Sequence, residues 1–222
     1  PPRATRTATS RCPRAPWPSC GNAGRATATP PGSSPRSGAA APAATRTHGV
    51  DDEAQLPYWE IANEAMSIRL VQRLPDQTRG FFQARGFSVE DSDLIAQNCV
   101  FQTVFRNRST AQGPVMIEYD LLEWTVHTDG AEGRPKTREH WKKVWAGRGA
   151  PPAAQLAFEW GLLPTRQSYG PGDYNWGLSL YGLPHGARFD LDVVWRQNGE
   201  RRGARLKNVQ CAPDVHPQPE GP

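Results

Sequence analysis

A strict two-residue alternation near the C-terminal end constrains the fold more than any other feature of the chain. Between residues 188 and 196 every second residue is apolar, and two of the residues between them are acidic: Phe189, Leu191, Val193 and Trp195 alternate with Asp190 and Asp192. This period predicts a β-strand with one buried and one solvated face. Asn198-Gly199 follows, and because this dipeptide favours a tight hairpin turn, we expect an antiparallel partner strand over residues 204–211.

Further short strands, separated by turns that contain Gly or Pro, are predicted upstream. Residues 64–74 fit a strand, although their spacing also fits a helix, and residues 115–128 fit a strand with a bulge near residues 122–124. The other predicted strands cover residues 99–105, 155–163 and 174–181. Many short strands of this kind predict a mainly β (α+β) fold, an antiparallel β-sandwich that is immunoglobulin-like in the loose sense.

Helices are predicted in two places. A short helical insertion is expected at about residues 75–98, where Gly86 ends one helix and Ser88-Val89-Glu90-Asp91 has the pattern of a capping box that opens another. A third helix is expected to begin after Thr137 and to present Trp141, Val144 and Trp145 on one face.

The positive charge of the chain is concentrated near its N-terminus. The chain has 26 basic and 22 acidic residues, but residues 1–50 contain seven Arg and no Lys, Asp or Glu, so the remainder has a net charge of −3. The tract also has too few large apolar residues to form a core. We therefore expect a disordered tract at 1–50, one domain at 51–212 and a disordered tail at 213–222. We expect no nucleic-acid partner for an acidic domain, and no membrane span.

The cysteines bear on the compartment. Cys12 and Cys20 lie in the Arg-rich tract, whereas Cys99 and Cys211 flank apolar segments far apart in sequence. A disulfide between Cys99 and Cys211 is one interpretation, and two unrelated buried thiols are the other. A disulfide would indicate a periplasmic or secreted protein, and we expect that an export signal is lost or misread in the Arg-rich tract. Asn107-Arg108-Ser109 matches a glycosylation sequon, which matters only in a eukaryotic secretory context.

The chain contains none of the common catalytic motifs. It has no Gly-rich phosphate loop, no G-x-S-x-G and no H-E-x-x-H, and His127, His140 and His185 do not stand at metal-ligand spacing from one another. Asp190 and Asp192 supply too few oxygen atoms for a Ca²⁺ site. We therefore predict no catalytic residue, no metal and no cofactor. The enzymatic alternative is a composite site assembled from His127, His140, Asp173 and Glu159.

An aromatic loop is the most unusual segment of the predicted domain. Residues 169–177 read Tyr-Gly-Pro-Gly-Asp-Tyr-Asn-Trp-Gly between two predicted strands. In a functional interpretation, Tyr174 and Trp176 form a stacking or protein-binding surface while Asp173 and Asn175 orient a ligand. In a structural interpretation, the two polar residues stabilise a turn and the aromatic rings close one end of the sandwich.

Three hypotheses about function follow. The first is a non-catalytic, exported binding or assembly module that binds a protein partner or a small ligand through Asp173, Tyr174, Asn175 and Trp176. The second is an enzyme with the composite His and Asp site, and the third is a metal-handling protein. A surface patch of exposed aromatic residues would favour the first hypothesis, and a closed polar pocket would favour the second.

Overall fold

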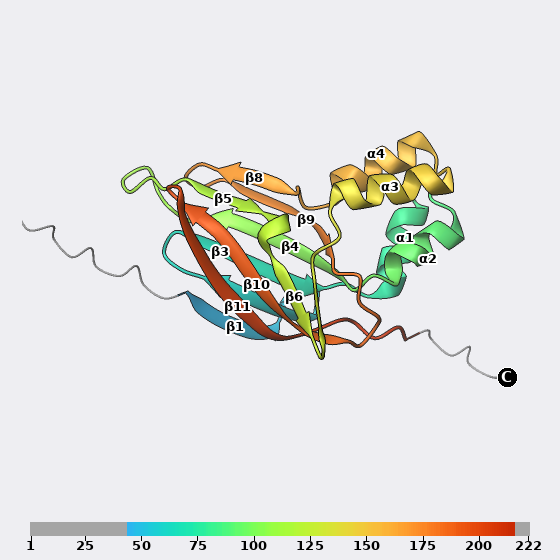
Figure 1. Cartoon of the computed structure of the whole chain (residues 1–222), viewed down its shortest axis with the longest axis horizontal. Coiled ribbons are helices and arrows are strands. Elements are labelled where there is room, and N and C mark those ends of the chain that lie inside the picture. Colours follow the sequence, from blue (N-terminus) through green and yellow to red (C-terminus); the bar gives the residue numbers. More distant parts are fainter. Residues whose placement is uncertain (1–43, 216–222) are drawn as a thin grey trace, which may run out of the picture. The chain divides into compact units, whose positions relative to one another are not determined.

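The computed structural model describes residues 44–215, and within this range the chain is mainly β. Two antiparallel sheets are accompanied by four short helices (Figure 1). This arrangement confirms the prediction of a mainly β, antiparallel fold with a helical insertion. The first sheet, called sheet A, has the strand order β1-β2-β3-β4-β9 and consists of β1 (Thr45–Val50), β2 (Pro57–Ala62), β3 (Met66–Gln72), β4 (Val100–Asn107) and β9 (Tyr174–Leu180).

The predicted alternating strand is the centre of the second sheet, called sheet B. Strand β10 (Arg188–Gln197) pairs with β11 (Glu200–Gln210) through the Asn198-Gly199 turn, as expected. A register shift between Phe189 and Leu191 accompanies this pairing. On its other side, β10 pairs with two short strands, and each of these pairs in turn with one further strand. The remaining strands are β5 (Ile117–Asp120), β6 (Thr125–Thr128), β7 (Ala131–Gly133) and β8 (Arg166–Tyr169).

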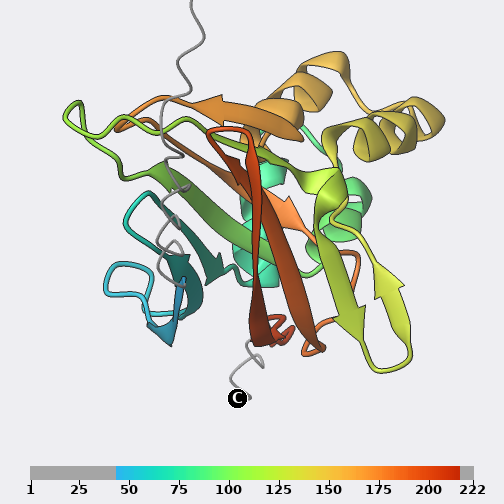
Figure 2. The same ribbon diagram turned by 60° about the vertical axis from the view of Figure 1, so that its left-hand side comes forward.

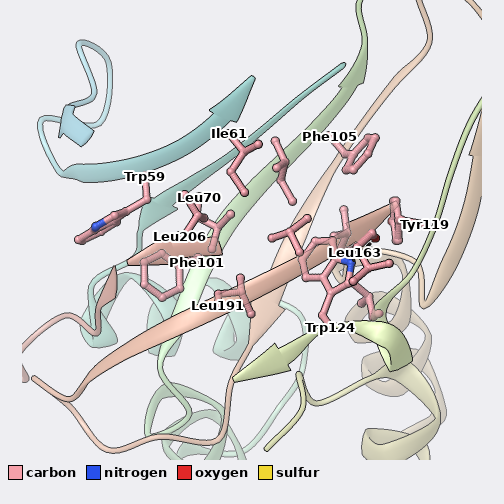
Figure 3. Packing of buried hydrophobic residues seen from close by; sticks show 14 of the residues in the cluster. Trp59, Ile61, Leu70, Phe101, Phe105, Tyr119, Trp124, Leu163, Leu191 and Leu206 are labelled. Atoms are coloured by element: carbon pink, nitrogen blue, oxygen red, sulfur yellow. Dashed lines mark hydrogen bonds between the residues drawn. The ribbon is translucent and has the colours of Figure 1, made fainter. Parts of the chain in front are cut away.

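The inward side chains of both sheets belong to one hydrophobic cluster. Figure 3 shows side chains of the two sheets pointing toward one another, with Phe101 and Phe105 of β4 on one side and Leu191 of β10 on the other. Trp124 is fully buried, and its indole N–H donates to the carbonyl of Val194 at 2.9 Å. Since each buried large side chain contributes about 1.5–3 kcal/mol, this cluster is the main source of stability.

The four helices form a second hydrophobic cluster with one end of sheet A. They are α1 (Pro75–Gln83), α2 (Val89–Ala96), α3 (Arg138–Arg148) and α4 (Pro152–Gly161). Figure 2 shows the yellow pair α3 and α4 next to the green pair α1 and α2. Their aromatic residues pack with Val100, Leu178 and Leu180 of β4 and β9. The helices therefore cover this end of sheet A.

The helix signals in the sequence are confirmed in three cases. Helices α1 and α2 form the predicted insertion, and the Ser88 side chain accepts a hydrogen bond from the Asp91 N–H at 3.0 Å. Thr137 caps α3, whose buried face contains Trp141 and Trp145. The strand predicted over residues 155–163 is wrong, because this segment belongs to helix α4 and the two residues that follow it. Ala154 and Phe158, one turn apart, face the second cluster, and so short an apolar run does not distinguish a strand from a buried helix.

Several boundaries also differ from the prediction. Strand β1 lies within the tract expected to be disordered, because it pairs through its backbone with β2 and needs few apolar side chains of its own. Residues 1–43 and 216–222, which make up most of the predicted disordered segments, lie outside the described residues, whereas residues 213–215 of the predicted tail are described. The predicted bulge is a short 3₁₀ helix, η1 (Leu121–Glu123), that separates β5 from β6. Strand β7 follows β6 directly and pairs with it.

The two domain cysteines are paired. The Sγ atoms of Cys99 and Cys211 lie 1.98 Å apart, at disulfide distance, and both residues are buried. Cys99 precedes β4 of sheet A, and Cys211 follows β11 of sheet B. The disulfide therefore connects the two sheets at residues separated by 112 positions.

Candidate ligand-binding face

The four residues predicted to bind a ligand do not share one surface. Asp173 lies in the turn between β8 and β9, where its Oδ2 accepts a hydrogen bond from the Gly170 N–H at 2.8 Å. Asn175 lies opposite Phe105 on β4, and the alternation of the strand places it on the other side of the sheet from its two neighbours. Asp173 therefore stabilises the turn, as in the structural interpretation.

Tyr174 and Trp176 share the outer face of sheet A. They are two residues apart on β9, and 60% of Tyr174 and 54% of Trp176 is exposed. Because of this exposure they do not close the end of the fold, as the structural interpretation expected. Two large aromatic side chains held on an edge strand but left in solvent are typical of a binding surface.

The register of sheet A shows which side chains lie beside this aromatic pair. Trp176 is paired with Val104 on β4, and Val104 is paired in turn with Arg69 on β3. In the next row, Tyr174 is paired with Arg106. We call the outward side chains of Arg69, Val104, Arg106, Tyr174 and Trp176 the open face.

The end of sheet A that the helices cover sets one limit of the open face. Leu178, two residues after Trp176, is only 3% exposed and packs in the second hydrophobic cluster. The Leu163 N–H donates to the Leu178 carbonyl at 2.9 Å, so the segment after α4 runs beside this part of β9. The helices therefore end the open face immediately after Trp176.

Two arginines of the open face differ in their surroundings. The Arg69 guanidinium donates to Glu60 at 2.9 Å and to Asp51 at 3.2 Å. Its partial burial acts to lower the pKa of Arg69, but the hydrogen bond and charge of Glu60 outweigh this effect, so that the pKa is raised. Arg106 lies 5.0 Å from the ring centroid of Tyr174, and no carboxylate among residues 44–215 forms an ion pair with it. The Arg106 guanidinium is thus available for a ligand.

A polar groove adjoins the aromatic pair. It has a volume of about 630 Å³ and runs across β2, β3 and β4 beside the turn that follows β1. Most of its lining residues are polar or charged: Asp51, Glu53, Glu60, Ser67, Arg69, Gln102 and Arg106, with Ala54, Val71 and Val104 as the apolar ones. The pKa of Asp51 is lowered, chiefly by the hydrogen bond from the Ala54 N–H. The carboxylates of Asp51 and Glu60 and the Arg69 guanidinium therefore hold one another in position.

The composite catalytic site considered as an alternative is not assembled. No hydrogen bond or ion pair within residues 44–215 joins any two of its four residues. His140 lies on α3, where burial and then the charges of Lys136 and Lys143 lower its pKa. Glu159 lies on α4, and Asp173 holds its own turn.

His127 instead belongs to a cluster of charged side chains on the outer side of sheet B. Its Nε2 atom lies 2.7 Å from Asp192, and its Nδ1 atom lies 3.1 Å from Glu132. Arg205 donates to both oxygens of Asp192 at 2.6 Å, and these bonds are the first cause of the lowered pKa of Asp192. The sequence places Asp192 on a solvated face, but only strand pairing brings Arg205 and Glu132 beside it. The charged members of this cluster bind one another.

The predicted glycosylation sequon is not presented by the folded domain. Asn107 is 0% exposed, and its side-chain nitrogen donates to the carbonyls of Val115 and Tyr169 at 2.7 and 3.0 Å. The atom that glycosylation would modify is therefore already bound inside the protein.

Comparison with protein-family models, curated proteins and solved structures finds no match for this chain. Within residues 44–215, no helix is long and apolar enough to cross a membrane, and no group of three or more His, Cys, Asp or Glu side chains is arranged to hold a metal.

Proposed function

We propose that this protein is a non-catalytic binding module that holds its ligand on the open face of sheet A. The observation that carries the proposal is the pair of exposed rings, Tyr174 and Trp176, beside the Arg106 guanidinium, which has no carboxylate partner among the described residues. Aromatic and Arg side chains supply a large share of the binding energy at recognition surfaces, because they combine wide apolar contact with directed hydrogen bonds.

The fold is suited to such a role. The two sheets would act as a β-sandwich, immunoglobulin-like in the loose sense, that presents a rigid sheet surface, and strands hold side chains more accurately than a loop does. Since the disulfide between Cys99 and Cys211 would persist only where thiols are oxidised, we place the protein in the periplasm or outside the cell. The ligand is then a protein partner or a small molecule met in that compartment.

The test compares two equally accessible tryptophans. Trp176→Ala removes the ring of the open face, and Trp160→Ala removes a ring that is 77% exposed on helix α4 and belongs neither to the open face nor to the lining of the groove. Binding is measured by calorimetry and surface plasmon resonance against neutral oligosaccharides, uronic-acid oligosaccharides and extended peptides. We expect at least one probe to bind the wild type and Trp160→Ala equally and Trp176→Ala about tenfold more weakly. Absence of binding by all three classes, or equal loss in both variants, would refute the proposal.

A further inference from the structure

We infer that the open face and the adjoining polar groove bind a neutral carbohydrate chain, an inference that rests on the binding function proposed above. The register places Trp176, Val104, Arg69 and Glu60 opposite one another on four successive strands. A ligand lying along this row meets an aromatic ring first and a set of charged hydrogen-bonding groups afterwards.

The aromatic end of the row fits the face of a sugar ring. A pyranose ring exposes C–H groups on its two faces and hydroxyl groups at its rim. Trp176 offers a wide apolar surface to such a face, and Tyr174, in contact with Arg106, offers a second ring in the neighbouring row. Neither ring stands at the bottom of an apolar pocket, which a peptide side chain would require for its anchor.

The groove end of the row fits the hydroxyl rim. Glu60 and Asp51 hold Arg69 by hydrogen bonds, so that carboxylate acceptors and guanidinium donors lie next to each other in fixed positions. Neighbouring hydroxyl groups of a sugar both donate and accept, and fixed polar partners bind them with little loss of side-chain entropy. Gln102 adds a side-chain amide to the groove, and this amide can also both donate and accept hydrogen bonds.

The charges of the groove select a neutral chain over an anionic one. Its carboxylates are those of Asp51, Glu53 and Glu60, and its cations are Arg69 and Arg106. An anionic polymer would meet Arg106 favourably but would be repelled by three carboxylates, one of which, Glu53, is exposed. A neutral ligand meets no such repulsion.

The spacing of the strands sets the length of the ligand. Neighbouring strands lie about 4.8 Å apart, so that Trp176 on β9 and Glu60 on β2 are separated by roughly 14 Å across the sheet. One sugar ring does not cover this distance, whereas a short oligosaccharide does. We therefore expect the site to bind a chain and not a free monosaccharide.

The experiment titrates the full chain with gluco-, xylo-, manno- and malto-hexaoses by calorimetry and by saturation-transfer NMR. At least one hexaose is expected to bind, its disaccharide about tenfold more weakly, and an oligogalacturonate of equal length more weakly than the hexaose. Trp176→Ala and Glu60→Gln are each expected to weaken binding about tenfold, and Trp160→Ala to leave it unchanged. Circular dichroism and the thermal midpoint establish that the variants fold. Both tryptophans are exposed, and Glu60→Gln keeps the size of a side chain that is partly buried.

The other outcomes separate this inference from the proposed function. A peptide or an oligogalacturonate that binds more tightly than every hexaose, and is lost in Trp176→Ala, overturns the carbohydrate inference and leaves the binding module standing. A hexaose that binds equally to the wild type, Trp176→Ala and Glu60→Gln overturns the inference as well, because the sugar then binds elsewhere. Failure of all probes overturns both.

Discussion

Removal of the disulfide gives the sharpest test of the fold. In the double variant Cys99→Ala/Cys211→Ala, the unfolded chain regains the freedom of a loop closed over a sequence separation of 112 residues. The chain-entropy relation gives an expected loss of about 4.8 kcal/mol in the free energy of unfolding for a loop of this length. Because domains are typically stable by about 5–15 kcal/mol, this loss removes a large part of the total.

Equilibrium urea unfolding, followed by Trp fluorescence, measures the effect. Wild type with reductant is expected to lose the same free energy as the double variant, and reductant is expected to leave the double variant unchanged. A difference below about 1 kcal/mol between oxidised and reduced wild type would refute the reasoning, because so small a value would mean that this bond does not constrain the unfolded chain.

Three further predictions concern individual side chains. Gly177→Ala should destabilise the domain by more than about 2 kcal/mol in urea unfolding, because the new Cβ would overlap the backbone of Leu162 and Leu163. Gly113→Ala, in open space, should change little. The folded pKa of Asp192 is lowered chiefly by Arg205, so its stabilisation is present above the unfolded pKa of about 3.9 and is lost as the pH falls through the lower folded value. The difference in thermal midpoint between wild type and Asp192→Asn should therefore shrink below about pH 4. Asn107→Ala should lower stability by about 2–3 kcal/mol, because it removes the two hydrogen bonds that the buried Asn107 side chain donates to the carbonyls of Val115 and Tyr169.

Each of these predictions has a result that contradicts it. Equal effects of the two glycine substitutions would mean that the backbone of Leu163 does not lie close to Gly177 on β9. A midpoint difference for Asp192→Asn that is constant from neutral to acid pH would mean that the carboxylate is not stabilised by its partners. A glycan mass on Asn107 in protein secreted from a eukaryotic host would contradict its burial.

Local patterns predicted the strands and helices whose signals lie within one segment. The alternation around Leu191 and the Asn198-Gly199 turn specify β10 and its hairpin because the period of a strand and the geometry of a tight turn are both local. Helix α4 was predicted as a strand because a buried apolar run has no period that separates the two structures. Strand β1 was not predicted, since its residues are mostly exposed and its pairing depends on β2.

The candidate site was predicted only in part, for a similar reason. Tyr174 and Trp176 were identified from the concentration of aromatic residues in one short segment. Arg69 and Arg106 were not identified, because their position beside these rings depends on the register of three strands that are far apart in sequence. Asp173 was assigned to a ligand, but its carboxylate is occupied by the turn that it stabilises.

The hydrogen bond from Leu163 to Leu178 has a consequence for the behaviour of the protein at high concentration. Strand β9 is the last strand of sheet A, and an uncovered last strand can recruit a strand from a second molecule and start aggregation. The crossing segment occupies part of β9, and a short stretch around Tyr174 and Trp176 remains beyond it. A stretch this short is a poor template for intermolecular pairing, so the segment that crosses beside β9 protects this edge of sheet A from the addition of a strand by a second molecule.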